Sequence, residues 1–114
     1  MRWSIALPMA ALIAALPAPA LARAGSFVLV NRTNVNLSDL AIRRYGTQEW
    51  KGLALAPASG AQGPVEFDDP DCAFDIRASA GGNQLVWSGV NLCEAKIVTL
   101  RRNEKSGALW VDYE

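Results

Sequence analysis

The feature that most constrains this chain is a hydrophobic alternation of period two, which recurs from residue 25 to the end. Short alternating runs are separated by segments rich in Gly, Asn, Asp and Pro. A period of two places successive side chains on opposite faces of a β-strand. No stretch after residue 25 has a helical period of useful length, so no crossover helix is available to join parallel strands. We therefore predict an all-β fold, a small antiparallel β-sandwich or barrel.

The alternation and the turn residues together predict about seven short strands. The expected strands cover residues 26–31, 37–45, 65–67, 72–79, 84–90, 96–102 and 108–113. Residues 53–63 are ambiguous, because a short helical turn could begin at Leu53 and end at Pro57 and Gly60. In the turn after the first strand, asparagines tolerate a left-handed backbone and Thr33 can bond locally.

The segment Ala80-Gly81-Gly82-Asn83 predicts a tight hairpin, because glycine at both central positions accepts a positive φ. Numbers of paired residues then sum to about 163, which places Cys72 opposite Asn91. A bulge at Gly89 would bring Cys93 toward Cys72, since glycine inside a strand often marks a bulge.

Residues 1–24 match a secretory signal peptide, with a positive Arg2, an apolar run and the pattern Ala22-Arg23-Ala24. We expect cleavage after Ala24, with a cut after Ala22 as the alternative, and a single β domain over residues 25–114. Three prolines interrupt the apolar run, so we expect no stable membrane span after signal cleavage. The protein is expected to be periplasmic or secreted.

The charge balance excludes some partners. The chain has 11 basic and 11 acidic residues, and the leader removes only Arg2 and Arg23, which leaves a net charge of −2. That value does not favour nucleic acid or an anionic membrane surface. Ninety residues form one small domain, whose core alone is marginal.

The two cysteines, Cys72 and Cys93, are expected to form a disulfide, as an even count in an exported small domain indicates. The bond closes a loop of about 22 residues and contributes about 3 kcal/mol. A nucleophilic Cys93 would need a base, and the chain contains no histidine. A two-cysteine metal site lacks further ligands for the same reason.

Three motifs resemble those of small exported bacterial proteins of unknown function. They are FVLVNRT (27–33), CAFDIR (72–77) and WSGVNLC (87–93). Members often carry Gly where this chain has Asn34, and some carry a twin-arginine signal, which this chain lacks. The resemblance implies the fold, the disulfide and export, and it implies no activity.

Trp50 is the candidate ligand-binding residue, because it lies in a polar loop. Trp50, Trp87 and Trp110 could form an aromatic platform, although tryptophans of a small sandwich more often belong to the core. Of each arginine pair, Arg43-Arg44 and Arg101-Arg102, only one member can join a common patch.

The acidic residues offer two further possibilities. Asp68, Asp69 and Asp71 could bind calcium, but their spacing matches no EF-hand, and a solvated turn is the alternative. A hydrolase could pair Glu66 with Asp68, or use Asp75, if two carboxyls lay about 5–9 Å apart in a cleft.

We expect no catalytic residue, no cofactor and no metal. The favoured function is an exported non-catalytic domain, a monomer or weak oligomer, that binds a protein or cell-surface partner. The alternative is a small-molecule or carbohydrate binding module that uses the Trp50 loop.

Overall fold

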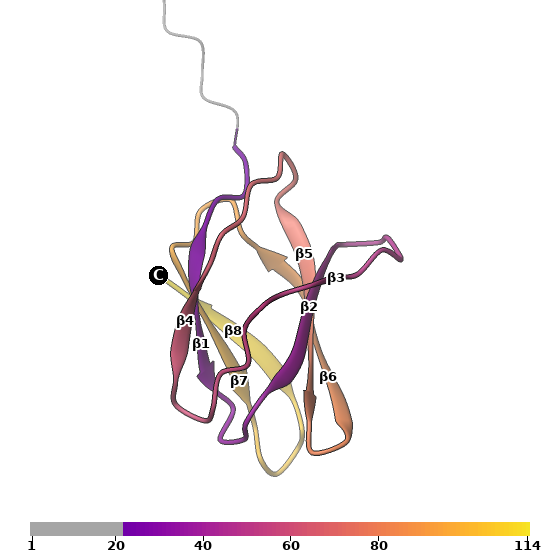
Figure 1. Cartoon of the computed structure of the whole chain (residues 1–114), viewed down its shortest axis with the longest axis vertical. Coiled ribbons are helices and arrows are strands. Elements are labelled where there is room, and N and C mark those ends of the chain that lie inside the picture. Colours follow the sequence, from indigo (N-terminus) through magenta and orange to yellow (C-terminus); the bar gives the residue numbers. More distant parts are fainter. Residues whose placement is uncertain (1–21) are drawn as a thin grey trace, which may run out of the picture.

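The chain folds into eight β-strands, described for residues 22–114 of a computed structural model (Figure 1). The strands are β1 (Phe27–Arg32), β2 (Ser38–Arg44), β3 (Lys51–Gly52), β4 (Gln62–Val65), β5 (Ala73–Ala80), β6 (Asn83–Asn91), β7 (Ile97–Arg102) and β8 (Leu109–Tyr113).

Two four-stranded sheets face each other. Their strand orders are β4-β1-β7-β8 and β3-β2-β5-β6. The two sheets form separate layers, with β1 and β4 in one and β2 and β5 in the other (Figure 1). The predicted small β-sandwich is therefore confirmed, with one short strand, β3, beyond the expected seven.

One strand pair corrects the expectation of an antiparallel fold. β1 and β7 run parallel, with Val28 beside Ile97 and Arg32 beside Arg101. A parallel pair needs a long connection, which is usually a helix. Here the connection between β1 and β7 includes the whole second sheet, so no helix is required. The remaining strand pairs of the two sheets are antiparallel.

Two local predictions are also wrong. The strand expected at residues 65–67 lies earlier, at Gln62–Val65, because those residues pair with β1. The possible helical turn from Leu53 does not form, and the described residues 22–114 contain no helix. Consistently, that part of the chain offers no apolar helix able to cross a membrane.

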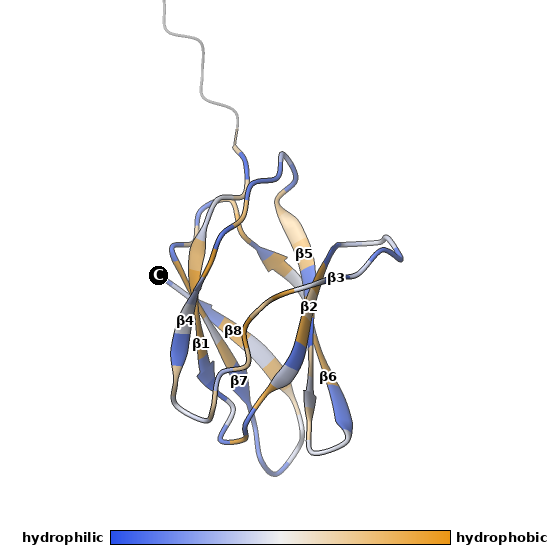
Figure 2. Ribbon diagram, in the orientation of Figure 1, coloured by the Kyte–Doolittle hydropathy of each residue, from blue (hydrophilic) through white to orange (hydrophobic). Residues whose placement is uncertain are grey.

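The core lies between the sheets and follows the alternation read from the sequence. Phe74, Ile76 and Ala78 of β5 point inward, opposite Leu29 of β1 and Leu100 of β7. Figure 2 shows hydrophobic segments along the strands and hydrophilic residues in the turn between β7 and β8.

Trp87 of β6 also belongs to this core, and it joins the two layers. Its side chain is buried, and its indole Nε1–H donates a hydrogen bond of 3.0 Å to the Arg101 carbonyl oxygen in the other sheet.

Asn31 and Thr33 are buried polar residues that fix the turn after β1. Asn31 Nδ2 donates to the carbonyl oxygens of Val35 and Pro57, and Thr33 Oγ1 donates to Asn31 Oδ1 at 2.6 Å. Asn34 next to them has a φ of 67°, the left-handed conformation that favours glycine or asparagine. The local bonding expected of Thr33 is confirmed, since its hydroxyl also contacts the Val35 carbonyl oxygen.

The β5–β6 hairpin confirms the predicted turn and bulge. Gly81 and Gly82 have φ values of 56° and 89°, and Ala80 pairs with Asn83. The register shifts between Phe74 and Ile76, where Gly89 has a φ of 68°. Because of that bulge, Cys72 lies opposite Leu92, whose N–H it accepts at 2.9 Å, rather than opposite Asn91 as predicted.

The predicted disulfide between Cys72 and Cys93 is confirmed, with a Cα–Cα distance of 5.0 Å. The bond lies just past the open end of the hairpin, where the bulge brings the two cysteines together.

Candidate functional site

The hollow on one side of the sandwich is the best candidate site. This side pocket has a volume of about 330 Å³ and opens between β2, β3 and the loop from β4 to β5. Its lining consists of Ile42, Arg43, Arg44, Thr47, Glu49, Lys51, Phe67, Asp69 and Phe74. The volume lies at the lower end of the range for small-molecule sites.

The inner lining of the side pocket is apolar. Phe67 and Phe74 pack edge to face, with ring centroids 5.0 Å apart, and Phe27 extends the cluster from behind Phe67 at 6.3 Å. Ile42 of β2 completes this surface. Phe74 and Ile42 are themselves buried, so an apolar group entering the pocket would first meet the partly exposed ring of Phe67.

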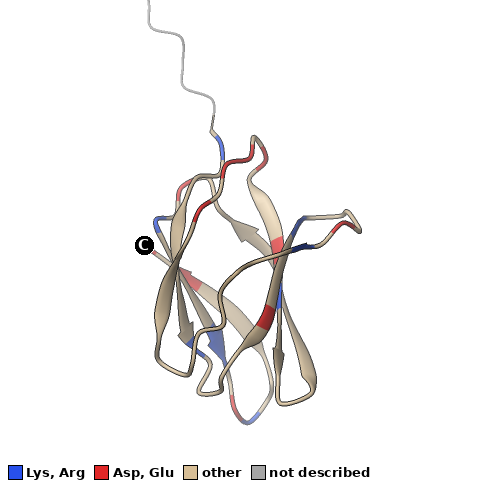
Figure 3. Cartoon of the chain, in the orientation of Figure 1, with Lys and Arg blue, Asp and Glu red and all other residues tan. Residues whose placement is uncertain are grey.

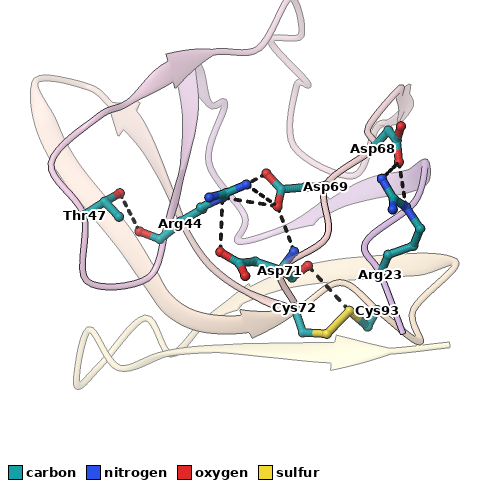
Figure 4. A network of polar contacts seen from close by, with 8 residues as sticks. All are labelled: Arg23, Arg44, Thr47, Asp68, Asp69, Asp71, Cys72 and Cys93. Carbon is teal, nitrogen blue, oxygen red and sulfur yellow. Dashed lines mark hydrogen bonds and ion pairs between the residues drawn. A yellow bond between two sulfur atoms is a disulfide. The ribbon is translucent and has the colours of Figure 1, made fainter. Parts of the chain in front are cut away.

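A group of paired charges, which we call the Asp69 cluster (Arg44, Asp69 and Asp71), forms one edge of the pocket (Figure 4). Arg44 Nη2 lies 3.0 Å from Asp69 Oδ1, and its Nε lies 3.1 Å from Asp71 Oδ2. The Asp71 N–H also donates to Asp69 Oδ1 at 2.8 Å.

These contacts shift both titrating groups toward their charged forms. Burial by itself would raise the pKa of Asp69, but the Asp71 N–H and the Arg44 guanidinium outweigh it and lower that pKa below its ordinary value. The hydrogen bond to Asp69 raises the pKa of Arg44. Within the cluster, Arg44 and Asp69 are thus held in their charged forms at neutral pH.

Glu49 and Lys51, the neighbours of Trp50 in the sequence, also line the pocket. Among residues 22–114, neither takes part in an ion pair. This part of the lining therefore presents one anion and one cation beside an apolar surface, although the charge of Lys51 also helps to lower the pKa of Asp69.

The loop of residues 45–50 covers this part of the pocket, and its first turn is built locally. The Thr47 N–H and hydroxyl both donate to the Arg44 carbonyl oxygen, at 3.1 and 2.8 Å. Gly46 supplies the φ of 84° that the turn needs. Tyr45 projects from the loop and is 61% exposed.

Trp50, the residue predicted to bind a ligand, does not line the side pocket. Its ring lies on the outer side of the sheet, where the guanidinium carbons of Arg43 and Arg77 lie 4.3 and 4.5 Å from its centroid. A cation over an indole ring is an attractive contact. These two arginines therefore already use part of the stacking surface of Trp50.

Arg43 also belongs to a second polar group, the Asp75 cluster (Asp75, Arg43, Ser88 and Gly89). The Asp75 carboxylate is only 2% exposed, although it faces the outer side of the sheet. It accepts from Arg43 Nε at 2.9 Å, from the Ser88 hydroxyl at 2.7 Å and from the Gly89 N–H at 3.1 Å. The β-bulge at Gly89 thus provides two of the hydrogen-bond donors to this carboxylate.

Burial would raise the pKa of Asp75, but the hydrogen bonds from Ser88, Arg43 and Gly89 lower it by more, so the carboxylate is ionised. The alternation of β5 places Asp75 on the face away from the core, but it does not indicate this buried cluster. The available signal was the glycine of the bulge, which lies opposite Asp75.

The three tryptophans do not form one platform. Trp87 is in the core, Trp50 is at the β3 edge of one sheet, and Trp110 is 44% exposed on β8 of the other sheet. Arg43 and Arg44 bond different carboxylates, Asp75 and Asp69, but both line the side pocket, so the prediction that only one of this pair can join a common patch is wrong.

The acidic run is distributed over separate arginine contacts. Asp68 pairs with Arg23, and Asp69 and Asp71 pair with Arg44 (Figure 4). Figure 3 shows acidic residues along the loop that leads into β5. Within residues 22–114, no three His, Cys, Asp or Glu side chains are grouped as a metal site requires. Asp75 lies in its own buried cluster, whereas the Asp68 side chain is 78% exposed, so these two carboxylates do not share one site.

Comparisons with known proteins give the fold alone. No protein-family model and no curated protein matches the sequence. The structure is similar to an NMR structure of a protein from Eubacterium rectale, with a TM-score of 0.53 and 14% sequence identity. The match covers 81% of this chain and 88% of that one. The domain is therefore a small β-sandwich, and its disulfide indicates an oxidising compartment outside the cytoplasm.

Proposed function

We propose that this protein is an exported, non-catalytic domain that binds a protein or cell-surface partner through the side pocket and the loop of residues 45–50. The observation that carries the proposal is the composition of the pocket, where the rings of Phe67 and Phe74 lie beside the charges of Glu49 and Lys51. An apolar anchor ringed by polar groups is the usual form of a binding hot spot.

The pocket geometry favours a partner that inserts one apolar side chain. A pocket of about 330 Å³ can accommodate an aromatic or aliphatic side chain against the two phenylalanines. Flanking charges of the partner would then meet Lys51 and Glu49 at the rim. Tyr45, exposed at the adjacent loop, would extend the contact.

The state of the carboxylates supports a non-catalytic role. Asp75 is ionised and buried, and both of its carboxylate oxygens already accept hydrogen bonds within the protein, so it has no proton to donate and little access to a substrate. We expect no turnover of glycan, ester or peptide substrates by the purified protein. Hydrolysis that disappears in Asp75→Asn, Asp68→Asn or Glu66→Gln, while the variant stays folded, would contradict this part of the proposal.

Site-specific photo-crosslinking in the exporting bacterium tests the binding surface. A photoreactive amino acid at Thr47 should give discrete adducts, whereas the same group at Glu104, in the hairpin between β7 and β8, should give none. Glu104 is exposed and lies outside the pocket lining, so it is a matched control.

A charge reversal sharpens that experiment. Lys51→Glu should reduce the Thr47 adducts, and Lys105→Glu, in the control hairpin, should leave them unchanged. Equal adducts from positions 47 and 104, or adducts insensitive to Lys51→Glu, would reject the pocket as the interface.

The volume of the pocket favours a second candidate, a free small molecule with an apolar ring and a carboxylate. The ring would pack on Phe67 and Phe74, and the carboxylate would meet Lys51. Benzoate and phenylalanine are suitable probes, and either should shift the amide NMR signals of the pocket residues in the wild type and not in Lys51→Glu.

A carbohydrate on Trp50 is the variant of this candidate that the sequence suggested. The sugar ring would have to stack on Trp50 beside Arg43 and Arg77, or displace these two arginines from the indole. Titration of the protein with glucose or cellobiose should then change tryptophan fluorescence in the wild type, and Trp50→Leu should abolish that change.

A further inference from the structure

The first described residues of the chain are part of the folded domain. Ala24 is fully buried and belongs to the hydrophobic core. Its N–H donates to the Asp69 carbonyl oxygen at 2.7 Å, and the Asp69 N–H donates back to the Ala24 carbonyl oxygen at 3.0 Å. This antiparallel bridge joins the start of the domain to the loop between β4 and β5, beside which the chain enters the sandwich (Figure 1).

Arg23 makes a second contact with the same loop. Its Nε and Nη2 donate to Asp68 Oδ1 at 2.9 and 2.6 Å (Figure 4). Both side chains are more than half exposed, so the pair adds little stability. It does align residue 23 with the loop that Ala24 pairs with.

These contacts distinguish the two points at which a signal peptidase could cleave an exported chain. Ala20-Leu21-Ala22 and Ala22-Arg23-Ala24 both have the small residues that a signal peptidase requires before its cleavage point. A cut after Ala24 removes a core side chain and leaves both backbone groups of Asp69 without their partners. A cut after Ala22 keeps the bridge, the core residue and the Arg23–Asp68 pair.

The solvent exposure of residues 22–24 in the folded domain favours the same cleavage point. Ala22 and Arg23 are exposed, whereas Ala24 is buried under the loop. Once the domain has folded, the Ala22–Arg23 bond remains accessible, and the bond after Ala24 is held by the bridge.

We propose that the leader is removed by hydrolysis of the Ala22–Arg23 peptide bond, so that the mature domain begins at Arg23. Water supplies a hydroxyl to the Ala22 carbonyl carbon and a proton to the Arg23 nitrogen, and the signal peptidase of the exporting cell provides the catalysis. The bridge between Ala24 and Asp69 then closes the end of the sandwich next to the side pocket.

Intact mass spectrometry of the exported protein tests the proposal. The full chain is expressed with its own leader in a bacterium and purified from the periplasm or medium. The expected mass is that of residues 23–114 with one disulfide. A main species that begins at Gly25 overturns the proposal, and a main species that retains Met1 overturns both the proposal and the leader.

A stability comparison tests the physical reason separately. The chain of residues 25–114 should have a Tm lower by about 4–8 °C or more than the chain of residues 23–114. The matched control is residues 23–114 with Arg23→Ser, which keeps Ala24 and should melt close to the parent. Equal Tm values for the two lengths would show that the bridge contributes nothing and would overturn the argument from burial.

Discussion

Two aspartate–arginine clusters of this protein have the same chemistry and different surroundings. The Asp75 cluster lies within a sheet, and its carboxylate is 2% exposed with all its hydrogen bonds made by β-structure and one arginine. The Asp69 cluster lies in a loop, where the Arg44 side chain is 48% exposed and that of Asp71 55%. Both lower the pKa of their central aspartate.

Because the two clusters differ in burial, a lowered aspartate pKa and a short ion pair do not by themselves indicate how much a cluster contributes to the free energy of unfolding. A buried carboxylate that loses its partners is left desolvated, and that is costly. An exposed ion pair that is broken returns to water at little cost. We therefore expect the Asp75 cluster to stabilise the sheet, and the Asp69 cluster to depend on the disulfide beside it to keep its loop in place.

The largest effect is expected from the disulfide, which tethers the Asp69 cluster to the end of β6. The double variant Cys72→Ser, Cys93→Ser should lose about 2–5 kcal/mol of unfolding free energy, the usual cost for a small exported domain. Urea denaturation measures it, and the wild type under reducing conditions is the control that should match.

The comparison of the two clusters also predicts which residues lose protection from hydrogen exchange when the disulfide is removed. Amide hydrogen exchange should accelerate most in residues 68–72 and least around Asp75. Uniform acceleration over both clusters, or an unchanged urea midpoint, would contradict this account.

Asp75→Asn should cost about 1.5–3 kcal/mol, the value for hydrogen bonds to a buried charged group. The pKa of Asp75 is lowered in the fold, so its stabilisation is present above the ordinary aspartate pKa of 3.8 and is lost as the pH falls below it. When the pH is lowered from about 5 to about 2, the unfolding free energy of the variant should therefore fall by less than that of the wild type. Denaturation at each pH measures both effects.

Ser88→Ala is the control for that change, because it removes one hydrogen bond and keeps the carboxylate and Arg43. It should lose less than Asp75→Asn and keep most of the acid sensitivity. A stability for Asp75→Asn equal to the wild type at neutral pH would refute the structural role of this residue.

Trp50→Leu extends the test to the outer edge of the Asp75 cluster, where Arg43 and Arg77 lie over the indole. Loss of an exposed cation–π contact costs about 0.5–1 kcal/mol. Thermal unfolding should show a correspondingly small drop. A loss as large as that of Asp75→Asn would mean that Trp50 has a packing role beyond these two contacts.

The smallest effect is expected from Arg44→Gln, and it should weaken in high salt because the side chains of Arg44 and Asp71 are about half exposed, although that of Asp69 is 14% exposed. Double-mutant cycles provide the direct contrast. The coupling energy of Arg43 with Asp75 should exceed that of Arg44 with Asp69, and it should be less sensitive to 1 M NaCl. The reverse order would overturn the comparison.

The sequence by itself determined the local elements of this protein. Alternation of period two gave the strands and their buried faces, since a strand's side-chain period is a property of the backbone. Gly81 and Gly82 gave the hairpin and Gly89 gave the bulge, because a positive φ is available mainly to glycine. The count of two cysteines left one possible intramolecular disulfide.

Only the tertiary structure decided which distant segments meet. The parallel pairing of β1 with β7 joins residues that are far apart in the chain. The two-residue strand β3 and the contact of Asp75 with Gly89 join nearer residues, but the alternation specifies neither of them. The side pocket arises in the same way, from a loop after β2 and a loop after β4. Periodicity fixes which face of a strand is buried, but it carries no information about which neighbour covers it, because that choice depends on packing over the whole core.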